Sequence, residues 1–201
     1  MSQRRLDFKR IEALAPQGAR ILDLGCGDGE LMVALCETRG CHVYGIDMDE
    51  RAVRSCIQWG APVFHGDMLE GMGYFHAGAF DLVILSQTLQ QVLRPAEVIR
   101  EMLRVGRRAV VSFPHLGYWR TRLALLDGRA PARYGLSPTA GNVTPNIRLC
   151  TRRDFRALCA GEGVTIEKEI LLTPAGREIH GPLADWRADV AIFVLGRRAN
   201  A

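Results

Sequence analysis

Three glycines at alternate positions follow a short apolar run near the start of the chain. The segment 21–30 reads ILDLGCGDGE, and its glycines are Gly25, Gly27 and Gly29. Glycine has no Cβ, so the backbone can turn sharply there and lie directly against a ligand. The dinucleotide-binding fingerprint G-x-G-x-x-G would need a glycine at position 30, where this chain has Glu30. The pattern predicts a buried strand, a tight turn and a helix start; a turn without any ligand is the alternative.

Three acidic residues, Asp23, Asp28 and Glu30, surround this turn. They would repel a pyrophosphate, so the turn suits a cationic ligand that also carries hydroxyl and amino groups. This combination resembles motif I of the class I S-adenosylmethionine (SAM) methyltransferases. The resemblance implies that SAM or S-adenosylhomocysteine is bound at the turn.

Polar residues also follow the later apolar runs, at the points where the predicted strands end. Asp47 ends the second strand, where a carboxylate would accept hydrogen bonds from both ribose hydroxyls. Asp67 follows the third strand, where it would accept from the adenine amino group with Met68 against the ring. Ser86 follows the fourth strand and would border the methionyl end of the ligand. The alternatives are that Asp47 caps the next helix and that Asp67 lies in an ordinary turn.

The predicted cofactor-binding residues come from these four strand ends. They are Asp23, Gly25, Cys26, Gly27, Asp47, Met48, Asp67, Met68 and Ser86. No catalytic residue is predicted, because Ser-Gln-Thr at 86–88 is neutral at pH 7 and makes a poor base. His115, which follows the fifth strand, is the best candidate base; its alternative role is to hold a loop by hydrogen bonds.

Helical and strand patterns alternate along the chain, which predicts an α/β, Rossmann-like class I methyltransferase fold. We expect a mostly parallel seven-stranded sheet with an antiparallel last strand and helices on both faces. The expected strands are 20–24, 42–46, 62–64, 80–85, 108–113, 164–172 and 188–197. The expected helices are about 5–15, 29–39, 50–59, 95–105, 118–126 and 151–161. Gly40 is the expected C-cap of one helix, Pro95 starts another, and Thr151–Asp154 is a capping box. The whole chain, 1–201, is expected to form one domain.

Composition excludes several classes of protein. With 48% hydrophobic and 24% charged residues, the chain is typical of soluble globular domains, and no run approaches the roughly 20 apolar residues of a membrane span. The polar N-terminal residues lack the apolar core of a signal peptide, so a cytoplasmic location is expected. Six cysteines form no C-x-x-C pair and are expected to be reduced and buried. The histidines show no metal-ligand spacing, so no metal is expected.

The region 120–156 is unusually basic. It holds eight arginines against Asp127 and Asp154, a local charge of +6 in a chain whose total is +4. It also contains the segment Tyr118-Trp119-Arg120 and an irregular stretch, 128–146, with three glycines and three prolines. Trp, Tyr and Arg are enriched at interface hot spots, so part of 118–153 is expected to dock a partner. The alternatives are solvated helix faces and an amphipathic helix that buries Trp119 and Leu123.

Four blocks together carry a closer resemblance. They are 22–30 (LDLGCGDGE), 83–90 (VILSQTLQ), 101–114 (EMLRVGRRAVVSFP) and 144–151 (TPNIRLCT). They resemble the MetW family of methionine biosynthesis proteins over about residues 18–172. The stretch 136–142 departs from that pattern, because a more aromatic and acidic loop is expected there.

The resemblance implies a SAM-type fold that partners homoserine O-acyltransferase (MetX) in a heteromeric complex. Members look like activating or regulatory subunits whose own methyl transfer is not established. One alternative is an active SAM-dependent methyltransferase that acts on a small molecule. A weaker alternative is an RNA methyltransferase, motivated only by the arginines. Nucleic-acid binding is not expected, because the net charge is low and no RNA-binding module is recognisable.

Overall fold

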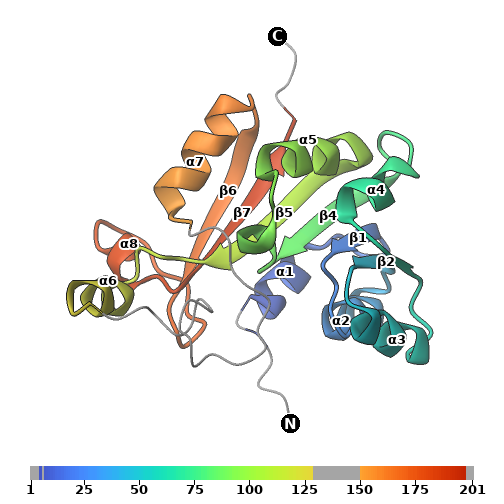
Figure 1. Cartoon of the computed structure of the whole chain (residues 1–201), viewed down its shortest axis with the longest axis horizontal. Helices are drawn as coiled ribbons and strands as arrows, with labels where there is room; N and C mark the ends of the chain where they lie inside the picture. Colours follow the sequence, from blue (N-terminus) through green and yellow to red (C-terminus); the bar gives the residue numbers. More distant parts are fainter. Residues whose placement is uncertain (1–4, 6, 129–149, 198–201) are drawn as a thin grey trace.

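The computed structural model describes residues 5, 7–128 and 150–197. Within these residues, seven strands form one sheet in the order β3-β2-β1-β4-β5-β7-β6 (Figure 1). The strands are β1 (Arg20–Leu24), β2 (His42–Asp47), β3 (Val63–His65), β4 (Phe80–Ser86), β5 (Gly106–Pro114), β6 (Thr165–Leu172) and β7 (Val190–Gly196). β7 runs antiparallel to both β5 and β6, whereas the other neighbouring pairs are parallel. The predicted fold class and its antiparallel last strand are confirmed.

Helices cover both faces of the sheet (Figure 1). They are α1 (Phe8–Leu14), α2 (Glu30–Arg39), α3 (Glu50–Gln58), α4 (Met68–Gly73), α5 (Pro95–Val105), α6 (Trp119–Leu126), α7 (Arg152–Gly161) and α8 (Ala184–Arg187), with a 3₁₀ turn at Leu89–Gln91. Successive strand residues point to opposite faces. Leu22 and Leu24 therefore pack into the core under α4, α5 and α7, while Ile21 packs into the core under α1, α2 and α3.

The parallel register brings the carboxyl ends of the first four strands to one edge of the sheet, here called the carboxyl edge. Leu24 at the end of β1 pairs with Ile46 of β2 on one side and with Leu85 of β4 on the other. The strand order changes direction between β1 and β4. In open α/β sheets this switch point is where ligands bind. The four predicted strand-end segments therefore meet at that edge.

Local signals in the sequence placed several helix ends. Gly40 ends α2 in the left-handed conformation, Pro95 begins α5, and the Thr151 capping box begins α7, as predicted. The N-terminal helix is shorter than expected and begins at Phe8. α4, α8 and the 3₁₀ turn were not predicted. Most of the irregular segment 128–146 lies outside the described residues.

The prediction for the cysteines is partly wrong. The described structure contains no disulfide, and four of the six thiols are buried, at positions 26, 41, 56 and 159. Cys36 is exposed and Cys150 is half-buried. Among the described residues no cluster of His, Cys, Asp and Glu could hold a metal ion, and no helix is long and apolar enough to cross a bilayer.

Candidate functional site

The glycine turn between β1 and α2 is tightly packed at one end and open at its centre. Gly25 has φ +69°, and a Cβ there would lie 2.6 Å from Oγ1 of Thr88. Gly27 has φ +57°, and a Cβ built there has no atom within 4 Å. Both positions need the left-handed backbone that glycine adopts without strain. The open space at Gly27 leaves room for a ligand against the backbone.

Asp47 holds this turn from the end of β2. Its Oδ2 accepts a hydrogen bond of 2.8 Å from the backbone N–H of Gly27, and its Oδ1 accepts one of 2.9 Å from the N–H of Asp49. Asp49, not Asp47, is the N-cap of α3, because its side chain accepts from the N–H of Arg51. The alternative that Asp47 caps this helix is therefore wrong. Asp47 is half-buried, and carboxylate oxygens can accept further hydrogen bonds.

Asp23 is a buried acid beside the turn. Its side chain is 2% exposed, and its Oδ1 has no hydrogen-bond partner among the described residues. Burial raises the pKa of this carboxyl to about 7; the Arg5 guanidinium lowers it, and the carboxylates of Asp47 and Asp7 raise it further. An unsatisfied buried carboxylate is costly. A cationic donor bound at this edge would satisfy it.

Asp67 and the two methionines flank the site on its β2–β3 side. Asp67 is exposed and caps α4, with its Oδ1 accepting from the N–H of Leu69 at 2.8 Å. It therefore lies at a helix N-terminus, not in an ordinary turn. Met48 is exposed, and Met68 is half-buried against the core. The roles of these residues toward a ligand stay predictions.

Ser86 lies at the end of β4, and its hydroxyl is hydrogen-bonded to the N-terminal segment. Its hydroxyl donates to Oδ2 of Asp7 at 2.7 Å and accepts from Nη2 of Arg5 at 2.6 Å. Asp7 is fully buried and also accepts from the hydroxyl of Ser112 at 2.6 Å and from Nε2 of Gln87 at 3.2 Å. Sequence reasoning missed Asp7 and Arg5, because they lie between 79 and 105 residues from their partners. Contact of Ser86 with a ligand stays a prediction.

Gln87 carries backbone strain at the same corner. It has φ +50°, and among the described residues it is the one non-glycine residue with a positive φ. Such a conformation persists only when its surroundings impose it, and it is common at ligand sites. Here the Gln87 backbone N–H donates to the carbonyl oxygen of Ser112 at 2.9 Å, and its side chain bonds Asp7. The N-terminal segment thus fixes the shape of this corner.

His115 is a structural residue. It is 1% exposed, and burial lowers the pKa of its imidazole, so the ring is neutral at pH 7. Its Nδ1 accepts from the backbone N–H of Arg152 at 3.2 Å, which leaves Nε2 to donate to the carbonyl oxygen of Asp185 at 3.1 Å. Both ring nitrogens therefore form hydrogen bonds to the backbone. The structure favours the alternative role of His115, which is to hold a loop by hydrogen bonds, over its role as the best candidate base.

The basic region predicted between 120 and 156 is partly neutralised. Arg152 forms ion pairs with Glu169 and Asp185, and Arg156 also pairs with Glu169. These contacts bind α7 to β6 and to the α8 region. Arg129, Arg133 and Arg148 lie outside the described residues. The local charge of +6 therefore overstates the charge available to a partner.

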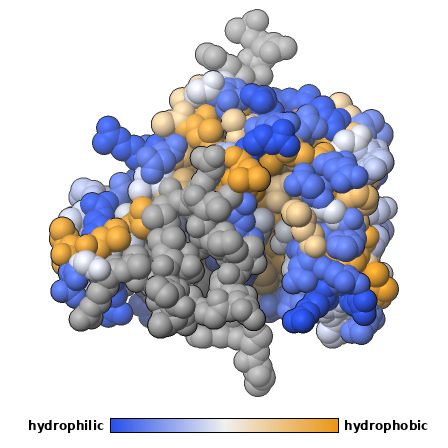
Figure 2. All heavy atoms as spheres, in the orientation of Figure 1, coloured by the Kyte–Doolittle hydropathy of each residue, from blue (hydrophilic) through white to orange (hydrophobic). Residues whose placement is uncertain are grey.

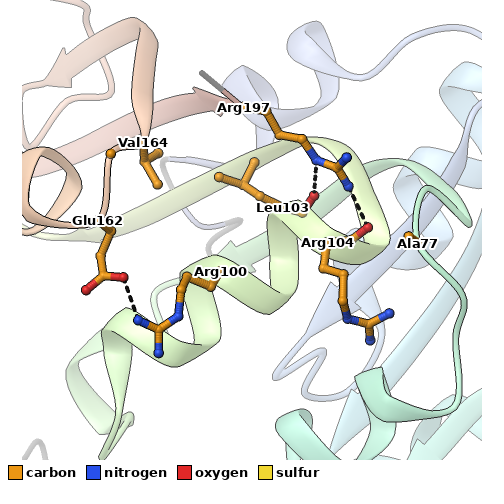
Figure 3. A pocket seen from close by; sticks show the side chains of 8 residues that line it. Ala77, Arg100, Leu103, Arg104, Glu162, Val164 and Arg197 are labelled. Atoms are coloured by element: carbon orange, nitrogen blue, oxygen red, sulfur yellow. Dashed lines mark hydrogen bonds and ion pairs between the residues drawn. The ribbon is translucent and has the colours of Figure 1, made fainter. Parts of the chain in front are cut away.

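A cavity of about 410 Å³ lies at the opposite edge of the sheet, where the parallel strands begin, here called the amino edge (Figure 3). Its arginines already bond protein groups. Arg197 donates to the carbonyl oxygens of Leu103 and Arg104, at the end of α5, at 2.7 and 2.8 Å, and Arg100 pairs with Glu162 at 2.7 Å. These side chains therefore bind other parts of the protein and hold the end of α5. The polar groups that a ligand could bond lie at the carboxyl edge instead.

The seven-stranded sheet, its switch point and the strand-end acids define a domain with the class I SAM-dependent methyltransferase fold. A SAM-dependent methyltransferase from Mesorhizobium loti superposes with a TM-score of 0.68 over 96% of this chain and 99% of its own, at 20% identity. The model of the family "Methionine biosynthesis protein MetW" matches residues 5–195. The chain belongs to the MetW family.

Two curated relatives differ in how much of this chain they match. The bifunctional methionine biosynthesis protein MetXA/MetW of Rhodopirellula baltica is 33% identical over 82% of this chain. The ubiquinone biosynthesis O-methyltransferase of Hahella chejuensis is 36% identical over 51% of this chain. The chain spans 28% of the first relative's length and 44% of the second's.

The residues at the carboxyl edge fit a ligand of the SAM type. Gly27 leaves open space beside its backbone, and Asp23 keeps a buried acceptor without a partner in the described structure. Asp47 stands at the end of β2, with Oδ2 accepting from Gly27 of the turn and Oδ1 accepting from Asp49. These carboxylate acceptors match a ligand that brings an ammonium group and vicinal hydroxyls.

Proposed function

We propose that this chain is a cytoplasmic, SAM-binding subunit of methionine biosynthesis that docks on homoserine O-acyltransferase (MetX) and raises its activity or stability. One observation carries the proposal: a relative named MetXA/MetW joins both names in a single chain, and this chain matches 28% of it. Fusion holds two modules at a high effective concentration. Separate chains that work together need an interface to achieve the same proximity.

The ligand is SAM or S-adenosylhomocysteine at the carboxyl edge. Asp47 would accept the ribose hydroxyls, Asp67 would lie near the adenine with Met68 against the ring, and Gly27 would let the ligand approach the backbone. Asp23 would accept the ligand's ammonium group, which favours the ionised carboxylate. When bound, SAM supplies an electrophilic methyl group on its sulfonium.

Methyl transfer by this chain alone is expected to be absent or very slow. The corner at 86–88 offers neutral side chains, and its serine and glutamine are bonded to the buried Asp7. His115 uses both ring nitrogens to hold backbone groups. General-base catalysis needs a group that can reach a substrate proton, and these groups are otherwise engaged.

The alternative is an active methyltransferase on a small molecule. The partial similarity to a ubiquinone biosynthesis O-methyltransferase over 51% of the chain favours it. Robust methyl transfer from labelled SAM to a defined acceptor, lost in the variant Gly27→Arg, would establish this alternative.

The test uses the purified chain and the acyltransferase from the same source. Size-exclusion chromatography of the mixture should give a complex, and acyltransferase activity or its half-life at elevated temperature should rise when this chain is added. Unchanged elution together with unchanged activity and half-life would contradict the proposed function.

A further inference from the structure

Helix α6 turns its apolar side chains outward. Of its eight residues only Thr121 is buried, whereas Trp119 is 37%, Leu123 52% and Leu126 83% exposed. These three positions are spaced i, i+4 and i+7, so they form one stripe along the helix. A helix of a soluble domain normally buries such a stripe. The alternative that α6 buries Trp119 and Leu123 is wrong.

The short helix α8 extends this stripe into a larger surface. Leu183 and Trp186 are 64% and 51% exposed, and the guanidinium of Arg122 lies 5.3 Å from the centre of the Trp186 ring. This contact joins α6 to α8. We call Trp119, Leu123, Leu126, Leu183 and Trp186 the α6–α8 surface. Figure 2 shows hydrophobic side chains gathered at the left edge, where Figure 1 places α6.

Exposed arginines outnumber the acidic residues among these apolar side chains, where Asp127 follows Leu126 and Asp185 lies on α8. Arg120, Arg122 and Arg187 are exposed on α6 and α8. Arg120 lies with its guanidinium 5.3 Å from the Trp119 ring. The nearby Asp185 carboxylate pairs with Arg152 at 3.2 Å. An apolar centre with a mainly cationic rim fits a partner surface whose apolar patch has acidic residues at its rim.

We infer that the α6–α8 surface binds an apolar, acid-rimmed patch on the acyltransferase, an inference that rests on the proposed function. A second copy of this chain fits less well, because two arginine rims would face each other and repel. The chain's own segment 129–149 holds three arginines and no acidic residue, so it would also bring like charge. The acid-rimmed partner is the occupant that charge favours.

The test compares two variants on this surface with two variants elsewhere. Leu126→Asp changes a side chain that is 83% exposed, so it should keep the melting temperature of the wild type. Trp186→Ala also removes the contact with Arg122, so the melting temperature and circular dichroism of each variant are measured beside binding. Ile57→Asp and Trp59→Ala, at the end of α3, are matched controls because their side chains are also exposed. Binding to the purified acyltransferase is measured by biolayer interferometry at low and moderate salt.

Leu126→Asp should weaken binding at least 100-fold and Trp186→Ala at least 10-fold, mainly through faster dissociation. The two controls should stay within twofold of wild type. Charge reversal of Arg120 to Glu should slow association several-fold at low salt and less at high salt.

Three outcomes would overturn the inference, and they are distinguishable. If the wild type does not bind the acyltransferase, the proposed function fails and the inference falls with it. If the wild type binds and all four variants bind equally well, only the position of the interface is wrong. If sedimentation shows that the wild type is a dimer and Leu126→Asp a monomer, the occupant is a second copy of this chain.

Discussion

At the carboxyl edge of the sheet, Asp23 keeps a buried oxygen without a partner in the described structure, and Gly27 borders open space. At the amino edge, the arginines around a cavity of about 410 Å³ are bonded to helix carbonyls or carboxylates. The carboxyl edge has a polar group whose hydrogen-bonding capacity a ligand would satisfy. The arginines at the amino edge are already bonded to other groups of the protein. We therefore base the proposed ligand site on unmet hydrogen-bonding capacity and not on cavity size.

The largest difference between the two edges should come from paired glycine substitutions. Gly27→Arg places a long side chain in the open space of the turn, so binding of S-adenosylhomocysteine should fall more than 100-fold. Gly78→Arg is the matched control, because Gly78 also has a positive φ and open space but lies at the amino edge. Both variants carry similar backbone strain, about 1 kcal/mol. Calorimetry with thermal melting separates loss of binding from loss of fold. Equal binding by both variants would contradict the proposal that the ligand binds at the carboxyl edge and not at the amino edge.

The next effect concerns pH and Asp23. The pKa of its carboxyl is about 7 in the folded chain and 3.8 in the reference state, so the folded state holds the extra proton between these values. The free energy of unfolding should therefore fall as pH rises from 4 to 7, by up to about 1.4 kcal/mol per pH unit from this group. The Asp23→Asn variant should lack this contribution. Urea unfolding at several pH values measures this contribution. If the free energy of unfolding depends on pH in the same way in both proteins, the raised pKa of Asp23 is contradicted.

A smaller effect is expected at the amino edge. Arg197→Ala removes two hydrogen bonds to the end of α5, so the free energy of unfolding should drop by about 1 kcal/mol. Affinity for S-adenosylhomocysteine should not change, because the arginine acts on the helix alone. A loss of affinity in a stable variant would show that the amino edge also takes part in ligand binding.

Local patterns predicted most of the fold. Alternating apolar runs placed the central strands, and the signals at Gly40, Pro95 and Thr151 placed helix ends, because each depends on residues close in sequence. The glycine turn and Asp47 were found for the same reason. They meet at one edge because parallel strands must place their carboxyl ends together.

Contacts between distant segments could not be predicted. Asp7 bonds Ser86 and Ser112, and no local pattern signals a contact between residues about 80 or more apart. The spacing of Trp119 and Leu123 would suit a buried helix face, yet tertiary packing leaves this face outside. Sequence periodicity shows that a face is apolar, but only the packing shows what covers it.

The most direct test of the central claim is isothermal titration of S-adenosylhomocysteine into the wild type, Asp47→Ala and Asp81→Ala. Asp81 is the matched control, because its Oδ2 accepts from the backbone N–H of Arg20 at the amino edge, much as Asp47 accepts from Gly27 at the other edge. The account predicts one site in the wild type, about 30-fold weaker binding in Asp47→Ala (on the order of 2 kcal/mol) and unchanged binding in Asp81→Ala. No heat of binding in the wild type, or equal affinity in all three proteins, would contradict it.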